Sequence, residues 1–374
     1  MTHHSNILTT LLMFIVIAIS TISCSDDTNI IYYCGNEYWS PAYYHAFYGF
    51  NDQIIDLNGN YARSYVNSMT VNNGNVYCCG YIEPKRGDNL IAVYWKNGKE
   101  IRLTDGSFYA SANDITISNG DIFCVGSEAD GYVQHAAIGY TYDTYEVRRS
   151  QAKCWKNGVE YYTLSNGDYN ASANGISITP DGTIHIIGYD KQKTGALGTS
   201  GYNYQYISAR HWVNGHIEEL DGAGCSNATA IYADNEQIYI GGWYDRSSDP
   251  GYISEIVAYW DGDFKRSLPL GGFIEAIHLV GSDIYMVGFD KRNDKRNNEE
   301  SYAVYWKNFE YIPLYKEYSN EQSAIYDMTS VGEDVYMAGF IGDKAGWWKN
   351  DHFIALNNVR GNLTGIHVEK SKIQ

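Results

Sequence analysis

Apolar and polar residues alternate with a period of two along most of the chain. A typical segment, "SANDITISNGDIFCVG" (111–126), contains two short alternating runs separated by a polar turn. This period is that of β-strands and differs from the 3.6-residue period of an amphipathic helix. Asn-Gly or Asp-Gly pairs stand between many of the runs, and such pairs accept the positive φ angles of tight hairpins. The pattern therefore predicts an all-β protein built from antiparallel hairpins.

A longer pattern repeats around a tryptophan, first in "AVYWKNGKEIRL" (92–103) and then five more times at intervals that fall from 60 to 42 residues. The repeated tryptophans are Trp95, Trp155, Trp212, Trp260, Trp306 and Trp348. Each unit consists of strand A ("SANDITI"), strand B ("DIFCVG"), strand C ("AKCW") and strand D ("EYYTL"). Four antiparallel strands repeated around an axis form a β-propeller. A stacked solenoid is the alternative, but it needs polar end caps.

The two ends of the repeat region predict how the ring closes. Residues 29–39 resemble a strand B, residues 43–57 resemble strands C and D with Tyr48 near the tryptophan position, and residues 362–370 resemble a lone strand A. Complete units begin near residues 64, 111, 172, 225, 273 and 323. We therefore expect seven blades, one of them shared between the N- and C-terminal segments; six or eight blades are the alternatives. The propeller then forms a single domain over residues 29–370, followed by a tail at 371–374.

The repeated Trp and Ala residues of strand C are expected to pack between neighbouring blades. Six cysteines follow the N-terminal region: Cys34, Cys78, Cys79, Cys124, Cys154 and Cys225. An even number permits disulfides. However, Cys34, Cys79 and Cys124 occupy equivalent or adjacent positions of strand B in different units, where cysteine behaves as a small buried hydrophobe. We therefore favour free buried thiols.

The N-terminus has the features of an export signal. An apolar run from Leu11 to Ile19 is too short to span a bilayer and fits the hydrophobic core of a signal peptide, although no Lys or Arg precedes it. Residues 1–23 are interpreted as a lipoprotein signal peptide, because "TISC" ends in Cys24, which would become the lipid-modified N-terminus. Residues 24–28 then form a short acidic linker. The alternative is an ordinary cleaved signal with a chance cysteine.

Two resemblances to known proteins follow from these segments. The repeat Ala-x-x-Trp-x-Asn-Gly, followed by Leu, Ser-Ala, Ile and Gly, resembles the HAF-type extracellular repeats of bacterial secreted proteins; the literal "HAF" stands at 45–47. This resemblance covers nearly all of the chain after the signal and implies a surface β-propeller without a fixed activity. "CSDD" (24–27) resembles the surface-export signal of Bacteroidetes lipoproteins, which implies a lipid anchor on the outer face of the outer membrane. A periplasm-facing anchor is the alternative.

Charge and motifs exclude several function classes. With 27 Lys and Arg against 44 Asp and Glu, the net charge is −17, which repels phosphate backbones and argues against nucleic-acid binding. No His-Glu-x-x-His, paired Cys-x-x-Cys or EF-hand spacing occurs, so no metal site is expected. The sequence contains neither the Gly-x-Ser-x-Gly motif that holds the nucleophile of many hydrolases nor a phosphate-binding loop. We therefore expect no cofactor and assign no catalytic residue.

The loops are asymmetric, and this asymmetry points to a binding face. The A–B and C–D connections are tight turns, whereas the B–C connections at 127–151, 189–208 and 243–254 are long and different from one another. Insertions on one face of a repeat architecture often mark the binding face. These segments are rich in aromatic residues, which suit recognition surfaces and stack on sugar rings. The candidate ligand-binding residues are Tyr140, Tyr142, Tyr145, Tyr202, Tyr204, Tyr206, Trp243, Tyr244 and Tyr252.

These features together predict a binding module held to the membrane by a lipid on Cys24, with a glycan or a protein as its extracellular ligand. One alternative is a glycan-cleaving enzyme with two carboxylates facing each other in the central funnel. Another is an envelope scaffold or assembly protein, which a broad apolar patch on one face would favour.

Overall fold

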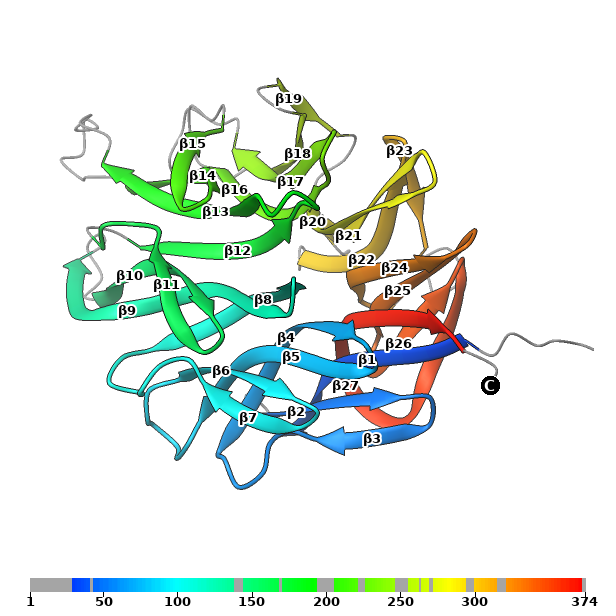
Figure 1. Ribbon diagram of the computed structural model, residues 1–374, viewed down its shortest axis with the longest axis horizontal. Coiled ribbons are helices and arrows are strands. Elements are labelled where there is room, and N and C mark those ends of the chain that lie inside the picture. The colour runs from blue at the N-terminus through cyan, green and yellow to red at the C-terminus, as the bar shows by residue number, and fades with distance from the viewer. Residues whose placement is uncertain are drawn as a thin grey trace, which may run out of the picture.

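The computed structural model describes residues 29–40, 43–137, 144–167, 170–193, 205–220, 226–245, 255–261, 264–268, 272–293, 299–314 and 321–371. Within these ranges every regular element is a β-strand, and no helix is found. The sheets surround one axis, which Figure 1 shows end on. The predicted all-β propeller architecture is therefore confirmed.

Five blades are separate four-stranded antiparallel sheets that follow one another along the chain. The first consists of β4 (Arg63–Asn72), β5 (Asn75–Glu83), β6 (Ile91–Lys96) and β7 (Lys99–Arg102). The second and third consist of β8 (Ala110–Ser118), β9 (Asp121–Ala137), β10 (Thr144–Lys156), β11 (Val159–Thr163), β12 (Ala171–Ile178), β13 (Ile184–Lys193), β14 (Gln205–Val213) and β15 (His216–Glu219). The fourth and fifth consist of β16 (Ser226–Ala233), β17 (Ile238–Asp245), β18 (Glu255–Asp261), β19 (Phe264–Ser267), β20 (Gly272–Val280), β21 (Asp283–Asn293), β22 (Glu299–Lys307) and β23 (Glu310–Pro313).

The last two blades share one long strand and form a seven-stranded sheet. This sheet has the order β24 (Ser323–Val331), β25 (Asp334–Ile341), β26 (Lys344–Lys349), β27 (His352–Lys370), β1 (Asn29–Ser40), β2 (Tyr43–Phe50) and β3 (Gln53–Asp56). The first part of β27 pairs with β26 and completes the sixth blade, whereas residues 361–370 pair with β1 and begin the seventh. The shared seventh blade predicted from the sequence is therefore present.

The innermost strands close the ring. Strands β4, β8, β12, β16, β20, β24 and the end of β27 each contact the next, and β27 contacts β4. The innermost strands of the six complete units begin within one residue of the predicted starts. Each inner strand is the edge strand of its own sheet, and its contacts with the inner strands of both neighbouring blades enclose it near the axis.

The tight turns lie on one face of the ring, and the B–C and D–A connections lie on the other, which we call the long-loop face. In the C–D turns, asparagines adopt positive φ angles, for example 49° at Asn97 and 53° at Asn157. The Asn97 side chain also accepts a hydrogen bond of 2.8 Å from the Val76 amide at the start of the adjacent strand. The predicted hairpin chemistry is therefore confirmed.

The B–C connection of the second blade differs from the expectation of a loop over 127–151. Strands β9 and β10 stay paired beyond the blade, from Glu128 opposite Gln151 out to Ala137 opposite Thr144. The length of this segment predicted a loop, yet its two halves continue the ladder of backbone hydrogen bonds of an antiparallel hairpin. This blade therefore carries a two-stranded extension.

The repeated tryptophans form the contacts between blades, as predicted. All six are at most 2% exposed. Each packs against core residues of the preceding blade; Trp155, for example, clusters with Tyr77 and Cys79, and Trp95 clusters with Cys34 of the shared blade. The strand-C alanines beside them are also buried. These residues therefore stabilise the ring and are not available to a ligand.

The shared blade replaces the tryptophan in a way that the sequence did not predict. Strand pairing places Gly49, not Tyr48, at the tryptophan position, because Gly49 pairs with Tyr33 as Trp95 pairs with Cys78. The fully buried Tyr33 ring occupies the space beside Gly49, where a Cβ would lie 2.5 Å from it. Tyr33 also stacks on Trp347 of the preceding blade at 5.6 Å between centroids. An aromatic residue on strand B thus supplies the missing ring.

The cysteines of the described residues are free and buried, as predicted; they are Cys34, Cys78, Cys79, Cys124 and Cys154. Cys225 lies outside the described residues. Cys34 and Cys78 join one hydrophobic cluster, whereas Cys79 and Cys124 join the next. The adjacent Cys78 and Cys79 therefore face different blade interfaces.

A buried histidine pair in the third blade predicts a pH-dependent stability. Nδ1 of His185 lies 3.0 Å from Nε2 of His211. Burial lowers the pKa of both imidazoles, and repulsion from His185 adds to this effect in His211, whose pKa falls to about 4. Between pH 4 and 6.5 the two imidazoles therefore bind more protons in the unfolded chain than in the folded chain, whereas the buried Glu275 and Asp327 carboxyls, with their raised pKa, do the reverse. The contribution of the histidine pair to the free energy of unfolding should fall by up to about 3 kcal/mol as the pH drops through this range.

Chemical denaturation of the wild type and of His211→Gln at pH 7.5 and pH 5 measures this effect. We expect the variant to lose much of the decrease on acidification, whereas His216→Gln, at the exposed first residue of β15, should retain it. An equal decrease in wild type and His211→Gln would contradict the assignment.

Candidate functional site

The innermost strand of every blade contains one extra, unpaired residue at the same position. In β8, for example, Ala112 pairs with Gly126 and Asp114 pairs with Val125, so Asn113 bulges out of the ladder. The seven bulged residues are Asn67, Asn113, Asn174, Thr229, Glu275, Tyr326 and Thr364. Bulges redirect side chains. Here all seven residues line one cavity on the ring axis, which we call the axial cavity.

A glycine on the neighbouring strand makes each bulge possible. A Cβ on Gly126 would lie 2.0 Å from the Ser111 carbonyl oxygen, and one on Gly188 would lie 2.0 Å from that of Ser172. Gly80, Gly242, Gly288 and Gly339 have the same close approach at 1.9–2.0 Å, and Gly35 has it at 2.2 Å. The glycine that ends strand B in each repeat is therefore a steric requirement of the ring of bulges.

The axial cavity has a volume of about 480 Å³, within the range of small-ligand sites. Its described lining is mainly polar and contains three carboxyl groups, those of Asp114, Glu275 and Asp327. No Lys, Arg or His is among these lining residues. The cavity therefore has an acidic and hydrogen-bonding interior.

The three bulged asparagines direct their donors away from the cavity and toward the next blade. Asn67 Nδ2 donates to the Ala112 carbonyl at 2.7 Å and to Ser111 Oγ at 3.1 Å. Asn113 and Asn174 repeat this arrangement, each with one bond to a backbone carbonyl and one to a side chain of the following blade. An amide has only two N–H donors. What Asn67 and Asn174 have left for a ligand is therefore their acceptor oxygen, whereas the Asn113 oxygen already accepts a hydrogen bond of 3.1 Å from Ser111 Oγ and keeps one lone pair.

The bulged threonines follow the same rule. Thr364 Oγ1 donates to the Val66 carbonyl at 2.9 Å, and the Thr229 hydroxyl donates to the Ile274 carbonyl. Five of the seven bulged residues thus use their donors to join neighbouring blades. Their remaining lone pairs make the wall of the cavity a hydrogen-bond acceptor.

Asp114 and Asp327 fasten neighbouring blades at equivalent positions directly after the bulge. Asp114 Oδ2 accepts a hydrogen bond of 2.9 Å from the Ile176 amide, and Asp327 Oδ2 accepts one of 2.9 Å from the Ile366 amide. Burial raises the pKa of both carboxyls, that of Asp327 to about 7, although backbone donors act in the opposite direction. These two acids therefore have structural partners.

Glu275 differs from both aspartates because its carboxyl group has no hydrogen-bond or ion-pair partner within the described residues. Burial alone raises its pKa to about 7. The phenols of Tyr65 and Tyr326 lie close enough for the Glu275 charge to raise their pKa, after burial as the first cause. Near neutral pH the cavity thus holds a partly ionised carboxyl group, without a protein partner among the described residues, beside two tyrosines.

Aromatic side chains gather where the inner strands approach the long-loop face. Tyr65 stacks on Tyr81 at 5.5 Å with nearly parallel rings, and Tyr44 meets Tyr65 edge-on at 5.5 Å. Tyr38, which is 39% exposed, continues the group at 5.3 Å from Tyr44. Since Tyr65 also lines the axial cavity, this group connects the cavity wall with the long-loop face.

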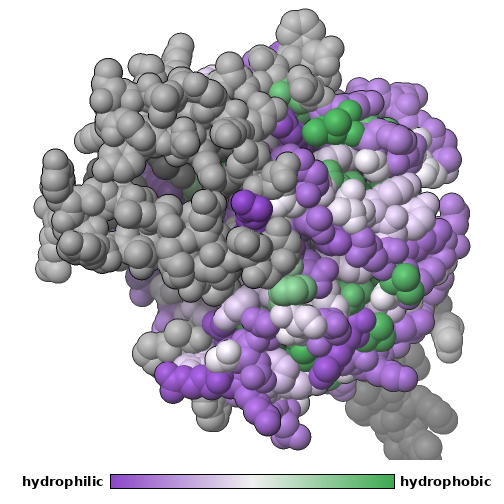
Figure 2. Space-filling view, turned by 90° about the vertical axis from the view of Figure 1, so that its left-hand side faces the viewer, coloured by the Kyte–Doolittle hydropathy of each residue, from purple (hydrophilic) through white to green (hydrophobic). Residues whose placement is uncertain are grey.

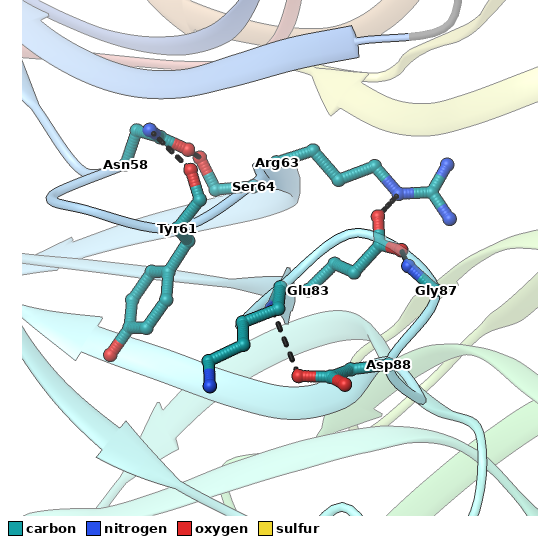
Figure 3. A network of polar contacts seen from close by, with 8 residues as sticks. Asn58, Tyr61, Arg63, Ser64, Glu83, Gly87 and Asp88 are labelled. Carbon is teal, nitrogen blue, oxygen red and sulfur yellow. Dashed lines mark hydrogen bonds and ion pairs between the residues drawn. The ribbon is translucent and has the colours of Figure 1, made fainter.

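A polar network stiffens the first blade on the same side (Figure 3). The Arg63 guanidinium pairs with Glu83 at 2.6 Å, and Glu83 also accepts the Gly87 amide of the β5–β6 loop at 2.7 Å. Ser64 donates to Asn58 Oδ1 at 2.8 Å and so fixes the connection that enters β4. These contacts hold the strand that carries Tyr65.

The loop aromatics predicted as ligand-binding residues do not form one described site. Tyr140, Tyr142, Tyr202, Tyr204 and Tyr252 lie outside the described residues, as does Cys24. Tyr145 lies in β10 and Tyr206 lies in β14, within ladders rather than loops.

Trp243 and Tyr244 are placed on opposite sides of β17. Trp243 is 8% exposed and packs edge-on against Phe273 at 6.3 Å. Tyr244 instead faces the outer strand, with its hydroxyl 2.8 Å from Ser267 Oγ and Lys265 Nζ 4.3 Å from its ring centroid. Both residues therefore support the blade.

The sequence analysis did not identify the ring of bulges, although each extra residue shifts the alternation of buried and half-buried positions by one, as it does at Asn67 in β4. The available signal was the alignment of "SAND" (111–114), "SANG" (172–175) and "NATA" (227–230). This alignment places Asn113, Asn174 and Thr229 at the same, third position of the motif. Glu275 and Tyr326 depart from that pattern, and such departures on an inner strand are where a ligand-specific residue is expected.

The large exposed apolar residues of the described chain are spread over several blades. Val159, Ile217 and Ile54 are 69%, 52% and 48% exposed, and they lie on the outer strands of three different blades. Figure 2 shows one side of the ring, where the described surface is mostly hydrophilic and the hydrophobic areas are small and separate. This side therefore has no broad apolar patch among its described residues.

Within the part of the chain that the structure covers, no three His, Cys, Asp or Glu side chains form a group that could hold a metal ion. The same part contains no helix long and apolar enough to cross a membrane. A scan against protein-family models finds no match to the chain. A search of curated proteins also finds no match.

Proposed function

We propose that this protein is a cell-envelope binding module that captures an extracellular glycan in the axial cavity, which the ligand enters from the long-loop face. One observation carries the proposal: seven bulged side chains converge on a cavity of about 480 Å³, and the aromatic group of Tyr65, Tyr81, Tyr44 and Tyr38 adjoins it. Sugar hydroxyls can donate to the acceptor wall, and sugar rings can pack on the tyrosines. This proposal places the ligand on the axis of the ring, and the loop tyrosines predicted from the sequence stay a separate prediction.

Retention of the purified full chain on a panel of host and dietary polysaccharides tests this proposal. The wild type should be retained by at least one of them, and Tyr65→Ala should lower retention about tenfold or more. Tyr161→Ala is a matched control, since Tyr161 is 44% exposed on an outer strand. Retention on no polysaccharide, or equal losses in both variants, would argue against glycan capture and favour a protein ligand.

A glycan-cleaving enzyme is a second candidate, favoured by the raised pKa of Glu275 and Asp327, both about 7, in one cavity. A carboxyl group kept protonated near neutral pH can act as a general acid. The retention assay distinguishes the two functions when released reducing ends are also measured. Release that Glu275→Gln abolishes would establish the enzyme, whereas retention without release supports capture.

We further propose that a lipid on Cys24 anchors the protein in the outer membrane, at the cell surface. The "TISCSDD" segment supports this proposal, and several acyl chains on one cysteine would anchor the chain stably. Cys24→Ala should move the protein from the membrane fraction into the soluble fraction. A variant that stays in the membrane fraction would contradict the lipid anchor, and protease treatment of intact cells distinguishes surface from periplasmic orientation.

A further inference from the structure

The axial cavity is asymmetric in its hydrogen-bonding capacity. The donors of Asn67, Asn113, Asn174, Thr229 and Thr364 all point into neighbouring blades. The described lining residues that still have donors are chiefly Tyr65, Tyr326 and Asn227. A ligand therefore meets many acceptors and few donors, so its own donors determine how well it fits.

The unpartnered group in this cavity is a carboxyl. Glu275 has no partner among the described residues, whereas Asp114 and Asp327 each accept two or more hydrogen bonds from the protein. Ionising Glu275 in this enclosed position costs free energy that no cation of the described lining offsets. A neutral hydroxyl satisfies one lone pair, but only a cation also offsets the charge.

We propose that the glycan carries a free amine, and that its ammonium group binds Glu275 between Tyr65 and Tyr326. This inference rests on the proposed function, because it names the class of sugar that the axial cavity takes. An ammonium group has three donors and no acceptor, which matches a wall of acceptors. The net charge of −17 also attracts a polycationic aminoglycan to the surface.

Three trisaccharides with the same β-1,4 backbone test the inference because they differ only at carbon 2. These are chitosan, chitin and cellulose trisaccharides, which carry an amine, an acetamide and a hydroxyl there. Calorimetric titration of the full chain at pH 7 should show that the amine binds at least tenfold more tightly than the other two. In Glu275→Gln this preference should fall to less than threefold.

A matched charge control separates the Glu275 carboxyl from net charge. Glu236→Gln removes one negative charge from an exposed position in a tight turn on the opposite face, and it should keep the tenfold preference. The titratable groups around Glu275 are Tyr65, Tyr326, Asp114 and Asp327. Since Glu275 ionises near neutral pH, affinity for the amine should rise from pH 5.5 to 7 in the wild type and not in Glu275→Gln.

The outcomes separate this inference from the proposed function. Equal binding of all three trisaccharides, or a preference that survives in Glu275→Gln, would overturn the amine site and leave glycan capture standing. Binding of 2-aminoethanol with no trisaccharide bound would support the cation site and contradict glycan capture. If neither the trisaccharides nor the amine bind, both proposals fail. Thermal unfolding of each variant confirms that lost binding does not come from lost folding.

Discussion

Deletion of residues 361–374 should abolish the folded ring. This segment is the innermost strand of the shared blade, and it pairs with β1 from Glu37 to Asn29. Without it, the N-terminal strands lose their connection to the axis and the ring becomes an open arc with exposed edges. Unfolding in urea, followed by the fluorescence of the buried tryptophans, should show no cooperative transition, whereas deletion of residues 371–374 alone should leave the transition intact.

The size of this effect follows from what the strand buries. Leu363, Ile366 and Val368 are at most 5% exposed, and each buried aliphatic side chain contributes about 1.5–3 kcal/mol. The bonds from Thr364 to the Val66 carbonyl and from Ile366 to Asp327 are lost as well. The sum approaches the 5–15 kcal/mol of a typical domain. A cooperative transition at an unchanged midpoint would contradict closure through the shared blade.

Among single Gly→Ala substitutions in the second blade, Gly126→Ala should lower the free energy of unfolding most. Its Cβ would lie 2.0 Å from the Ser111 carbonyl oxygen and 2.9 Å from Ala112 Cα, both of which are backbone atoms that no side-chain rotation can move. The bulge at Asn113 would have to shift and break its bonds to Ser172 and Ala173. We expect the free energy of unfolding to fall by more than about 3 kcal/mol.

Gly120→Asn in the turn of the same hairpin is the control for this substitution. Gly120 has a φ of 84° and open space around its Cβ, and asparagine tolerates positive φ angles. Urea denaturation should place this variant within about 1 kcal/mol of the wild type. Equal destabilisation in both variants would mean that the close approach at Gly126 does not limit stability.

The architecture could be predicted because it depends on patterns that repeat. The tryptophan of strand C recurs since each blade must fill the same space against its neighbour, and the Asn-Gly turns recur since each hairpin needs positive φ angles. The closing blade could be inferred because residues 29–39 and 362–370 are complementary halves of one unit. Tyr33 was not foreseen, since the pairing register, rather than the sequence, places its ring beside Gly49.

The candidate site was less predictable because it depends on geometry across blades. In the alternating pattern of apolar and polar residues, Glu275 is one more polar residue of a strand. The residues next to it in the sequence do not distinguish it from the solvent-exposed acidic residues of the loops. Only the bulge and the ring arrangement bring Glu275 together with Tyr65 and Tyr326, which are far apart in sequence. The aromatic loop segments attracted attention because composition is visible in a sequence, whereas convergence is not.

A crystal structure of the protein bound to the oligosaccharide that retains it best would test the central claim most directly. Our account predicts ligand density in the axial cavity. One donor group of the sugar should lie at the Glu275 carboxyl, and other donor groups of the sugar should lie at the side-chain oxygen of Asn67 or Asn174. Density confined to the outer loops, with the axial cavity free of sugar, would contradict it.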